Sequence, residues 1–378
     1  MSKLKSSRRY DLDWIKVLAT FIVFLYHCSM FFNPFEWHVK NNEIDAEAIL
    51  AFSLYIGVWI MPIFFVISGL SSYYSLQKRS GSQYIRERLA RLGIPLLFGI
   101  FILTPPQVYI ERVYLQQFSG SFLDFLPHAY EGVYLEMGGP GNFAFVGLHL
   151  WYLLALILFS FLTLGLFLKT KPFKKVTGIK LFLLHIPFIL LTSFVETVKL
   201  GGWDLLVYLM YFLFGFYVFT SESLLNYLEK TRWIHYTLAI LPTTAYIIWF
   251  FIEYPDRGTV GFVIFSTLLV IGSINILLSI YHLGHTYLSF NNKLLTYASE
   301  AAMPFYIIHQ PVIVIIGFFI KDLSWPIGLK LVFLICISFI IIMGIYHYVV
   351  RNLSPIRILF GLKGKKNGPP IPTNNQQM

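Results

Sequence analysis

Long apolar runs recur along the chain and are separated by short polar stretches. A helix that crosses the hydrocarbon core of a bilayer needs roughly 20 mostly apolar residues. Runs that can hold such a helix lie near 14–33, 50–76, 91–110, 143–168, 180–196, 203–220, 233–252, 259–284, 300–320 and 327–350. The pattern predicts an all-α fold, a polytopic membrane helix bundle of about ten transmembrane helices over residues 1–362.

Composition supports the same class of protein. Hydrophobic residues make up 57% of the 378 residues and charged residues only 13%, whereas soluble domains carry about 25% charged residues. A water-soluble fold of this size cannot bury so much apolar surface. The last stretch, 363–378, is rich in Lys, Gly, Pro, Asn and Gln, so we expect a disordered cytoplasmic tail there.

The distribution of basic residues predicts the orientation in the membrane, because Lys and Arg concentrate on the cytoplasmic side. With both termini cytoplasmic, only six of the 29 basic residues fall on the outer side: Lys40, Arg112, Lys199, Arg257, Lys321 and Lys330. The net charge of +10 then reflects topology and anionic lipid rather than nucleic-acid binding. We expect a multi-pass protein of the cell membrane whose first helix is not a cleaved signal peptide.

The first apolar run carries polar side chains that a bilayer makes costly, which marks them as functional candidates. Lys16 and His27 are eleven residues apart, so at 100° per residue they lie on one helix face, and Thr20 lies on the same stripe. Histidine is the side chain best suited to taking up and returning a proton near neutral pH. The alternative is a histidine that bonds between helices and a lysine that extends to the interface.

Two further histidines lie inside predicted spans, His149 in GLHLWYLLAL and His309 in FYIIHQPV. From their positions in oppositely directed helices, His27 and His149 should share a depth, with His309 nearer the midplane. The three side chains can therefore line one cavity. No carboxylate accompanies them at ligand spacing, so we predict no metal site.

A basic cluster follows the second span. The segment YIRERLARLGIP places Arg86, Arg88 and Arg91 at the cytoplasmic mouth, and Arg8 and Arg9 precede the first span. Guanidinium groups are geometrically suited to phosphates, so the cluster can hold a large anionic cofactor. The charge bias of cytoplasmic loops is an alternative explanation for the same arginines.

These segments, in this order, resemble the acyltransferase-3 family of membrane-bound acyltransferases, and the branch they suggest is that of glucan-modifying succinyltransferases. The matching residues extend from Arg8 to Pro311: RRYDLDWIK with His27, then FFVISG, RERLARLGIP, HLWYL and FYIIHQPV. Members of the family have ten spans and carry an arginine ahead of the first-helix histidine, with ten residues between the two. Lys16 occupies that place here, so the forked guanidinium of an arginine is replaced by the compact ammonium charge of a lysine.

The resemblance implies an enzyme that moves an acyl group, of acetyl or succinyl type, from cytoplasmic acyl-CoA to a hydroxyl of an outer-side sugar or glycan. The arginines would hold the CoA phosphates. His27 would act as general base or acyl carrier, and His149 and His309 would orient the acceptor or stabilise the oxyanion.

The alternative from another class is a proton-coupled transporter or flippase of a glycan or anionic solute, although the sequence lacks the inverted repeat with interrupted helices typical of transporters. The identities of the acyl group and the acceptor, and the oligomeric state, stay open at this stage.

Overall fold

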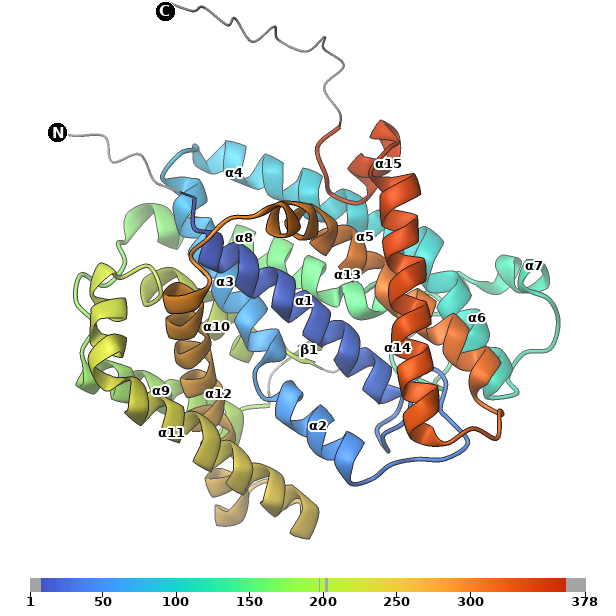
Figure 1. Ribbon diagram of the computed structural model, residues 1–378, viewed down its shortest axis with the longest axis horizontal. Coiled ribbons are helices and arrows are strands. Elements are labelled where there is room, and N and C mark those ends of the chain that lie inside the picture. The colour runs from blue at the N-terminus through green and yellow to red at the C-terminus, as the bar shows by residue number, and fades with distance from the viewer. Residues whose placement is uncertain (1–7, 197, 201–202, 365–378) are drawn as a thin grey trace, which may run out of the picture.

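The computed structural model describes residues 8–196, 198–200 and 203–364. Most of the predicted tail, 365–378, lies outside the described residues. The chain folds into one helical bundle, and its described ends lie at the same end of that bundle as α4 and α15 (Figure 1). We call this the basic end, because Arg8, Arg9, Arg88, Arg91 and Lys363 gather around a cavity that opens there.

The long helices are α1 (Tyr10–Met30), α3 (Ile60–Leu76), α8 (Trp151–Lys169), α9 (Gly178–Phe194), α10 (Leu205–Tyr217), α11 (Glu222–Ile252), α12 (Val260–Tyr287), α13 (Lys293–Ile320) and α14 (Ile327–Gly344). Shorter elements are α2 (Ala48–Gly57), α4 (Gly81–Arg88), η1 (Leu89–Gly93), α5 (Ile94–Phe98), η2 (Gly99–Leu103), α6 (Thr104–Tyr114), α7 (Phe122–Phe125), η3 (Leu126–His128), η4 (Leu148–Leu150), η5 (Ile345–Val350) and α15 (Ser354–Leu359). Two-residue strands β1 (Lys199–Leu200) and β2 (Trp203–Asp204) pair antiparallel.

The predicted spans correspond to these helices and confirm the fold class. Eight helical stretches among the described residues are long and apolar enough to cross a membrane. The predicted fifth and sixth spans are the shorter apolar helices α9 and α10. The third span extends further than the apolar run alone, over Gly81–Tyr114, because a Ser80–Gln83 capping box begins it in the polar segment ahead.

Close backbone contact explains how the short helix α10 is held. A Cβ on Gly69 of α3 would lie 1.9 Å from the Phe212 carbonyl oxygen, and one on Gly215 would lie 2.0 Å from the Val66 carbonyl oxygen. Two glycines therefore let α3 and α10 touch backbone to backbone, the arrangement by which small residues join membrane helices.

The centre of the bundle is formed by α1 and α13, which lie side by side with α3 beside them (Figure 1). The two run in the same direction, because both begin at the basic end. Arg9 at the start of α1 and Thr296 in the first turn of α13 line the cavity there, and the contacting histidines lie further along each helix. Asp11 and Asp13 lie in the first turn of α1, where carboxylates favour the positive end of the helix dipole. Asn292 caps α13 by accepting a bond from the Leu295 amide.

Candidate active site

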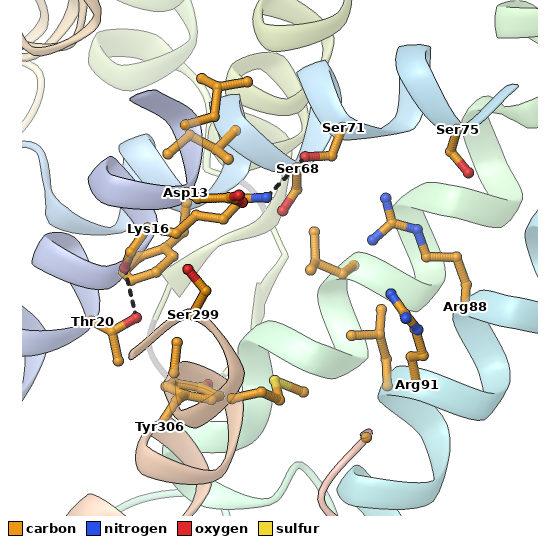
Figure 2. Close-up of a pocket in the computed structure, with 18 of the residues that line it drawn as sticks. Asp13, Lys16, Thr20, Ser68, Ser71, Ser75, Arg88, Arg91, Ser299 and Tyr306 are labelled. Atoms are coloured by element: carbon orange, nitrogen blue, oxygen red, sulfur yellow. Dashed lines mark hydrogen bonds between the residues drawn. The ribbon is translucent and has the colours of Figure 1, made fainter. Parts of the chain in front are cut away.

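A cavity of about 1040 Å³ opens at the basic end and extends between α1, α3, α8 and α13. Its walls carry basic side chains and hydroxyl groups. Figure 2 shows Lys16 on one side of it and Arg88 and Arg91 reaching in from another, with Ser68 and Ser71 between them and Ser75 above Arg88. A cavity of this size and charge fits a large anionic ligand.

Lys16 projects from α1 into this cavity with little to bind. Its Nζ lies 3.4 Å from Ser71 Oγ, a long contact for a group with three donors. Thr20, one turn further along the helix, returns its hydroxyl to the Lys16 carbonyl at 2.8 Å. Both residues line the cavity, so the stripe seen in the sequence faces it as far as Thr20.

The structure places four of the five predicted arginines at the cavity. Arg8, Arg9, Arg88 and Arg91 line it, whereas Arg86 is exposed and does not.

These four differ in their partners. Arg9 pairs with Asp11 at 2.5 Å and Arg8 with Asp13 at 2.7 Å. Arg88 donates to Ser72 Oγ at 2.8 Å. Its guanidinium also lies 5.2 Å from the centroid of the Tyr84 ring. The side chain of Arg91 makes no hydrogen bond or ion pair with any residue that the structure describes, so it is available to a ligand.

The deep end of the cavity stops one helical turn short of the predicted histidines. Its lining ends at Val23, Tyr152 and Tyr306, which are respectively four, three and three residues from His27, His149 and His309. Tyr306 donates its hydroxyl to the His149 carbonyl. A tyrosine therefore lies where the cavity meets the histidine layer.

The three histidines do come together, but none of them lines this cavity or the smaller one at the start of α13, so the prediction that they line one is not met. His27 Nδ1 and His309 Nε2 are 2.5 Å apart, and their rings stack with centroids 4.8 Å apart. The His149 and His309 ring centroids are 5.2 Å apart. His309 is almost fully buried, while His27 keeps some exposure.

Hydrogen bonding indicates which nitrogen of each ring carries a proton. His309 Nδ1 lies 2.6 Å from the Tyr306 carbonyl oxygen and must donate to it. Neutral His309 is then an acceptor at Nε2, so His27 donates from Nδ1. This leaves His27 Nε2 unprotonated, with its lone pair free to take up a proton.

His149 is oriented by the same logic. Its Nε2 lies 3.1 Å from the Ile307 carbonyl oxygen and donates to it, so Nδ1 of the neutral ring is an acceptor. That Nδ1 is buried and has no hydrogen-bond partner among the described residues. Because an unpaired buried acceptor is costly, it is a candidate to receive a bond from a substrate hydroxyl.

A second polar network lies beyond the histidines, and the sequence reasoning missed it. Glu111 of α6 is buried and accepts from His38 Nδ1 at 2.5 Å, Tyr134 OH at 2.8 Å and the Gly138 amide at 2.9 Å. Gln310, next to His309 in the chain, lies 3.1 Å from His38 Nε2 through its amide nitrogen. The only sequence signal was a carboxylate at the end of an apolar run.

The segment between α1 and α2 covers His27. The Trp37 ring stacks on the His27 ring, with centroids 5.3 Å apart. Lys40 holds this segment by donating to the carbonyls of Met30 and Phe35, and burial lowers the pKa of Lys40 to about 8. Trp37 therefore lies between His27 and the end of the bundle opposite the basic end.

In the ranges that the structure describes, no group of three or more His, Cys, Asp or Glu residues is arranged to hold a metal ion. Each of the three histidines instead binds a carbonyl or another imidazole.

Comparison with known proteins identifies the kind of enzyme that carries this site. The acyltransferase domain model of the acyltransferase-3 family matches residues 9–347. A glucans biosynthesis protein C from Salmonella heidelberg is 22% identical over 371 residues, and one from Salmonella paratyphi B is 23% identical over 378 residues; each match covers 91% of both chains. No solved structure matches the chain. The chain belongs to the acyltransferase-3 family, and it is a multi-pass membrane enzyme that transfers acyl groups other than amino-acyl groups.

Proposed function

We propose that this enzyme moves an acyl group, of acetyl or succinyl type, from cytoplasmic acyl-CoA to a hydroxyl of a cell-surface or extracytoplasmic glycan. The observation that carries the proposal is the alignment of a basic cavity with a histidine, His27, whose Nε2 is free to act as a base. The glucan-biosynthesis name of the relatives supports a glycan acceptor.

The distribution of basic residues supports an orientation with the basic end and both termini in the cytoplasm of a cell-membrane protein. Acyl-CoA is made and kept in the cytoplasm, so the mouth of the cavity would open to the donor. The segment that carries Trp37 would then face the outside, where the glycan is.

The dimensions of the donor match the cavity. Lys16 lies eleven residues before His27 on α1, which is ~16 Å along the helix. The pantetheine arm runs through about thirteen bonds from the thioester sulfur to the first phosphate, or ~16 Å when extended at the per-bond length of an extended chain. With the thioester at His27, the diphosphate therefore reaches Lys16, whose ammonium has only one long contact.

In the reaction, His27 Nε2 takes the proton of the acceptor hydroxyl as the oxygen attacks the thioester carbonyl. The new ester bond forms, the carbon–sulfur bond breaks, and the proton passes from His27 to the departing CoA thiolate. His309 positions His27 by fixing its tautomer, and His149 Nδ1 accepts a bond from the acceptor sugar and orients it. Tyr306 has to move aside to admit the thioester.

The test is turnover by the purified enzyme in liposomes, given acetyl-CoA or succinyl-CoA inside and glucan outside, with mass spectrometry of the glucan. We expect a mass increase of one acyl group with one of the two donors. The same glycans from cells with and without the gene should differ by that group. Unmodified glucan with both donors and in both cell types would contradict the proposal. Acid quenching during turnover adds a further readout, because a trapped acyl-histidine would make His27 an acyl carrier instead of a base.

A further inference from the structure

A second cavity, of about 440 Å³, lies at the start of α13 at the basic end. Thr296 and Glu300 line both this cavity and the large one, so the two adjoin. Neither the sequence motifs nor the histidine chemistry uses it. Its other walls include Lys293, Tyr297 and Arg351.

From this cavity we infer that Lys293, Tyr297 and Arg351 form the subsite for the nucleotide part of the donor, a 3′-phosphorylated adenosine diphosphate. The inference rests on the proposed function, because it takes acyl-CoA to be the donor. It assigns to the nucleotide a place that the arginines of the large cavity do not provide.

Distance along α13 is the first argument. Lys293 lies sixteen residues before His309 in the same helix, which is ~24 Å of rise. The pantetheine arm covers ~16 Å of that path, and the diphosphate and ribose extend beyond it. The adenosine therefore reaches the first turns of α13, where the second cavity lies. The corresponding measurement on α1 places the diphosphate at Lys16, so two independent helices give a consistent position for the donor.

Charge is the second argument. Glu300 is the carboxylate in the wall of the cavity, and Arg357 pairs with it at 2.6 Å. That leaves the cations of Lys293 and Arg351 without a carboxylate partner among the described residues. Two unpaired cations beside a neutralised carboxylate favour a phosphate, and the ribose 3′-phosphate of the donor is the group that reaches this far.

The shape of the wall is the third argument. The Arg351 guanidinium lies 5.3 Å from the centroid of the Tyr297 ring, and the Tyr297 hydroxyl is held by His347 Nδ1 at 3.1 Å. A planar guanidinium beside a fixed aromatic ring is a surface on which a purine stacks. The amides of Asn291 and Asn292 line the same cavity and offer donors and acceptors to the edge of the base.

The experiment compares two donors, acyl-CoA and acyl-pantetheine, which share the thioester but differ in the nucleotide. We expect Arg351→Gln and Lys293→Gln to raise the KM for acyl-CoA by ~10-fold, as for a lost hydrogen bond to a charged group, with kcat unchanged. The kcat/KM for acyl-pantetheine should not change. Lys230→Gln is the matched control, because Lys230 is exposed on α11 and lines neither cavity. Equal effects on both donors, or none on either, would overturn the inference.

Direct binding separates this inference from the proposed function. Adenosine 3′,5′-bisphosphate should bind the wild-type protein, measured by calorimetry, and bind the two variants ~10-fold more weakly. If that holds while no donor is turned over, the subsite stands and the proposed acyl transfer fails. If the variants bind the bisphosphate like the wild type, the subsite is wrong even when turnover is normal. The protein could instead retain only anionic phospholipid and show no binding in phosphatidylcholine liposomes. That result would assign the cavity to a lipid headgroup and overturn the inference.

Discussion

The two halves of the bundle differ in how fully their charged groups are paired. At the basic end Arg8 and Arg9 bind aspartates, but other cations there have few partners. In the half at the basic end, Lys16 has one contact at 3.4 Å and Arg91 has no polar partner among the described residues. In the opposite half, Glu111 receives bonds from His38, Tyr134 and the Gly138 amide. Buried charges are costly unless they are paired, so the half-buried Lys16 ammonium carries a cost that a bound anion would remove.

This difference separates groups that bind a ligand from groups that hold the fold. Removing a cation from the cavity should weaken ligand binding while stability stays the same or rises. Removing a member of the paired network should lower stability, because the partners lose their compensation. His27, His149 and His309 lie between the two halves, and substitutions there should change the rate of the reaction without changing stability.

The largest effect is expected at His27. His27→Ala should lower acyl transfer by ~10²- to 10⁴-fold, the usual contribution of a positioned acid or base, while the amount of folded protein in the membrane changes little. Acyl incorporation by purified variants in lipid, with thermal stability measured alongside, checks this. Normal acyl transfer by a folded His27→Ala protein would show that His27 is not the base.

The half opposite the basic end is tested at Glu111. Glu111→Ala should lower the free energy of unfolding by ~3–5 kcal/mol, the usual cost of breaking a buried charge pair. Glu131 serves as the control, since its pair with His128 is exposed and Glu131→Ala should change stability by less than ~1 kcal/mol. Denaturation in detergent measures both. Equal stabilities for the two variants would show that the network does not hold the fold.

The half at the basic end is tested at Arg88, whose guanidinium bonds to the Ser72 hydroxyl and to no carboxylate among the described residues. Arg88→Gln should raise the KM for acyl-CoA by ~10- to 100-fold with little change in kcat, because a bond to a charged group is lost. Arg86→Gln should leave the KM unchanged, since Arg86 lies outside the cavity. Steady-state kinetics in liposomes separates these outcomes. A larger increase in KM for Arg86→Gln than for Arg88→Gln would indicate that the donor phosphates bind at the outer surface of α4.

At Lys16 we expect smaller effects, of opposite sign on activity and on stability. Lys16→Met should lower kcat/KM by ~10-fold through the lost charge-assisted bond, yet raise the melting temperature, because a poorly compensated ammonium is replaced by an apolar chain. Lys16→Arg should keep most of the activity, since it retains the charge and restores the residue usual in the family. Kinetics and melting temperature are measured on the same variants. A lower melting temperature for Lys16→Met would show that Lys16 stabilises the fold.

The smallest effect is a pH dependence at Lys40, outside both charge clusters. The pKa of Lys40 falls from 10.5 to about 8 on folding, so between those values the unfolded chain binds more protons and stability rises with pH. The melting temperature of the wild type, relative to that of Lys40→Met, should therefore increase between about pH 8 and pH 10.5. A difference that stays constant with pH would mean that Lys40 titrates normally in the folded protein.

Part of the arginine result was already implicit in the sequence. At ~100° per residue, and measured the shorter way, Arg88 lies ~160° from Arg86 but only ~60° from Arg91. One face of α4 and η1 therefore carries Arg88 and Arg91, and Arg86 points elsewhere. The charge pattern alone treated the three as one cluster, since it counts residues in a loop and ignores their direction.

The membrane spans, the α1 stripe from Lys16 to Thr20 and the three candidate histidines could be predicted from the sequence. These follow from hydropathy and helical periodicity, which are local properties of consecutive residues. The folded structure was needed to show that His309 bonds to His27, that Trp37 stacks on His27, and that the start of α13 adjoins the large cavity. Those contacts join residues far apart in the chain, and they depend on how helices pack around glycines and bulky side chains, which no local period encodes.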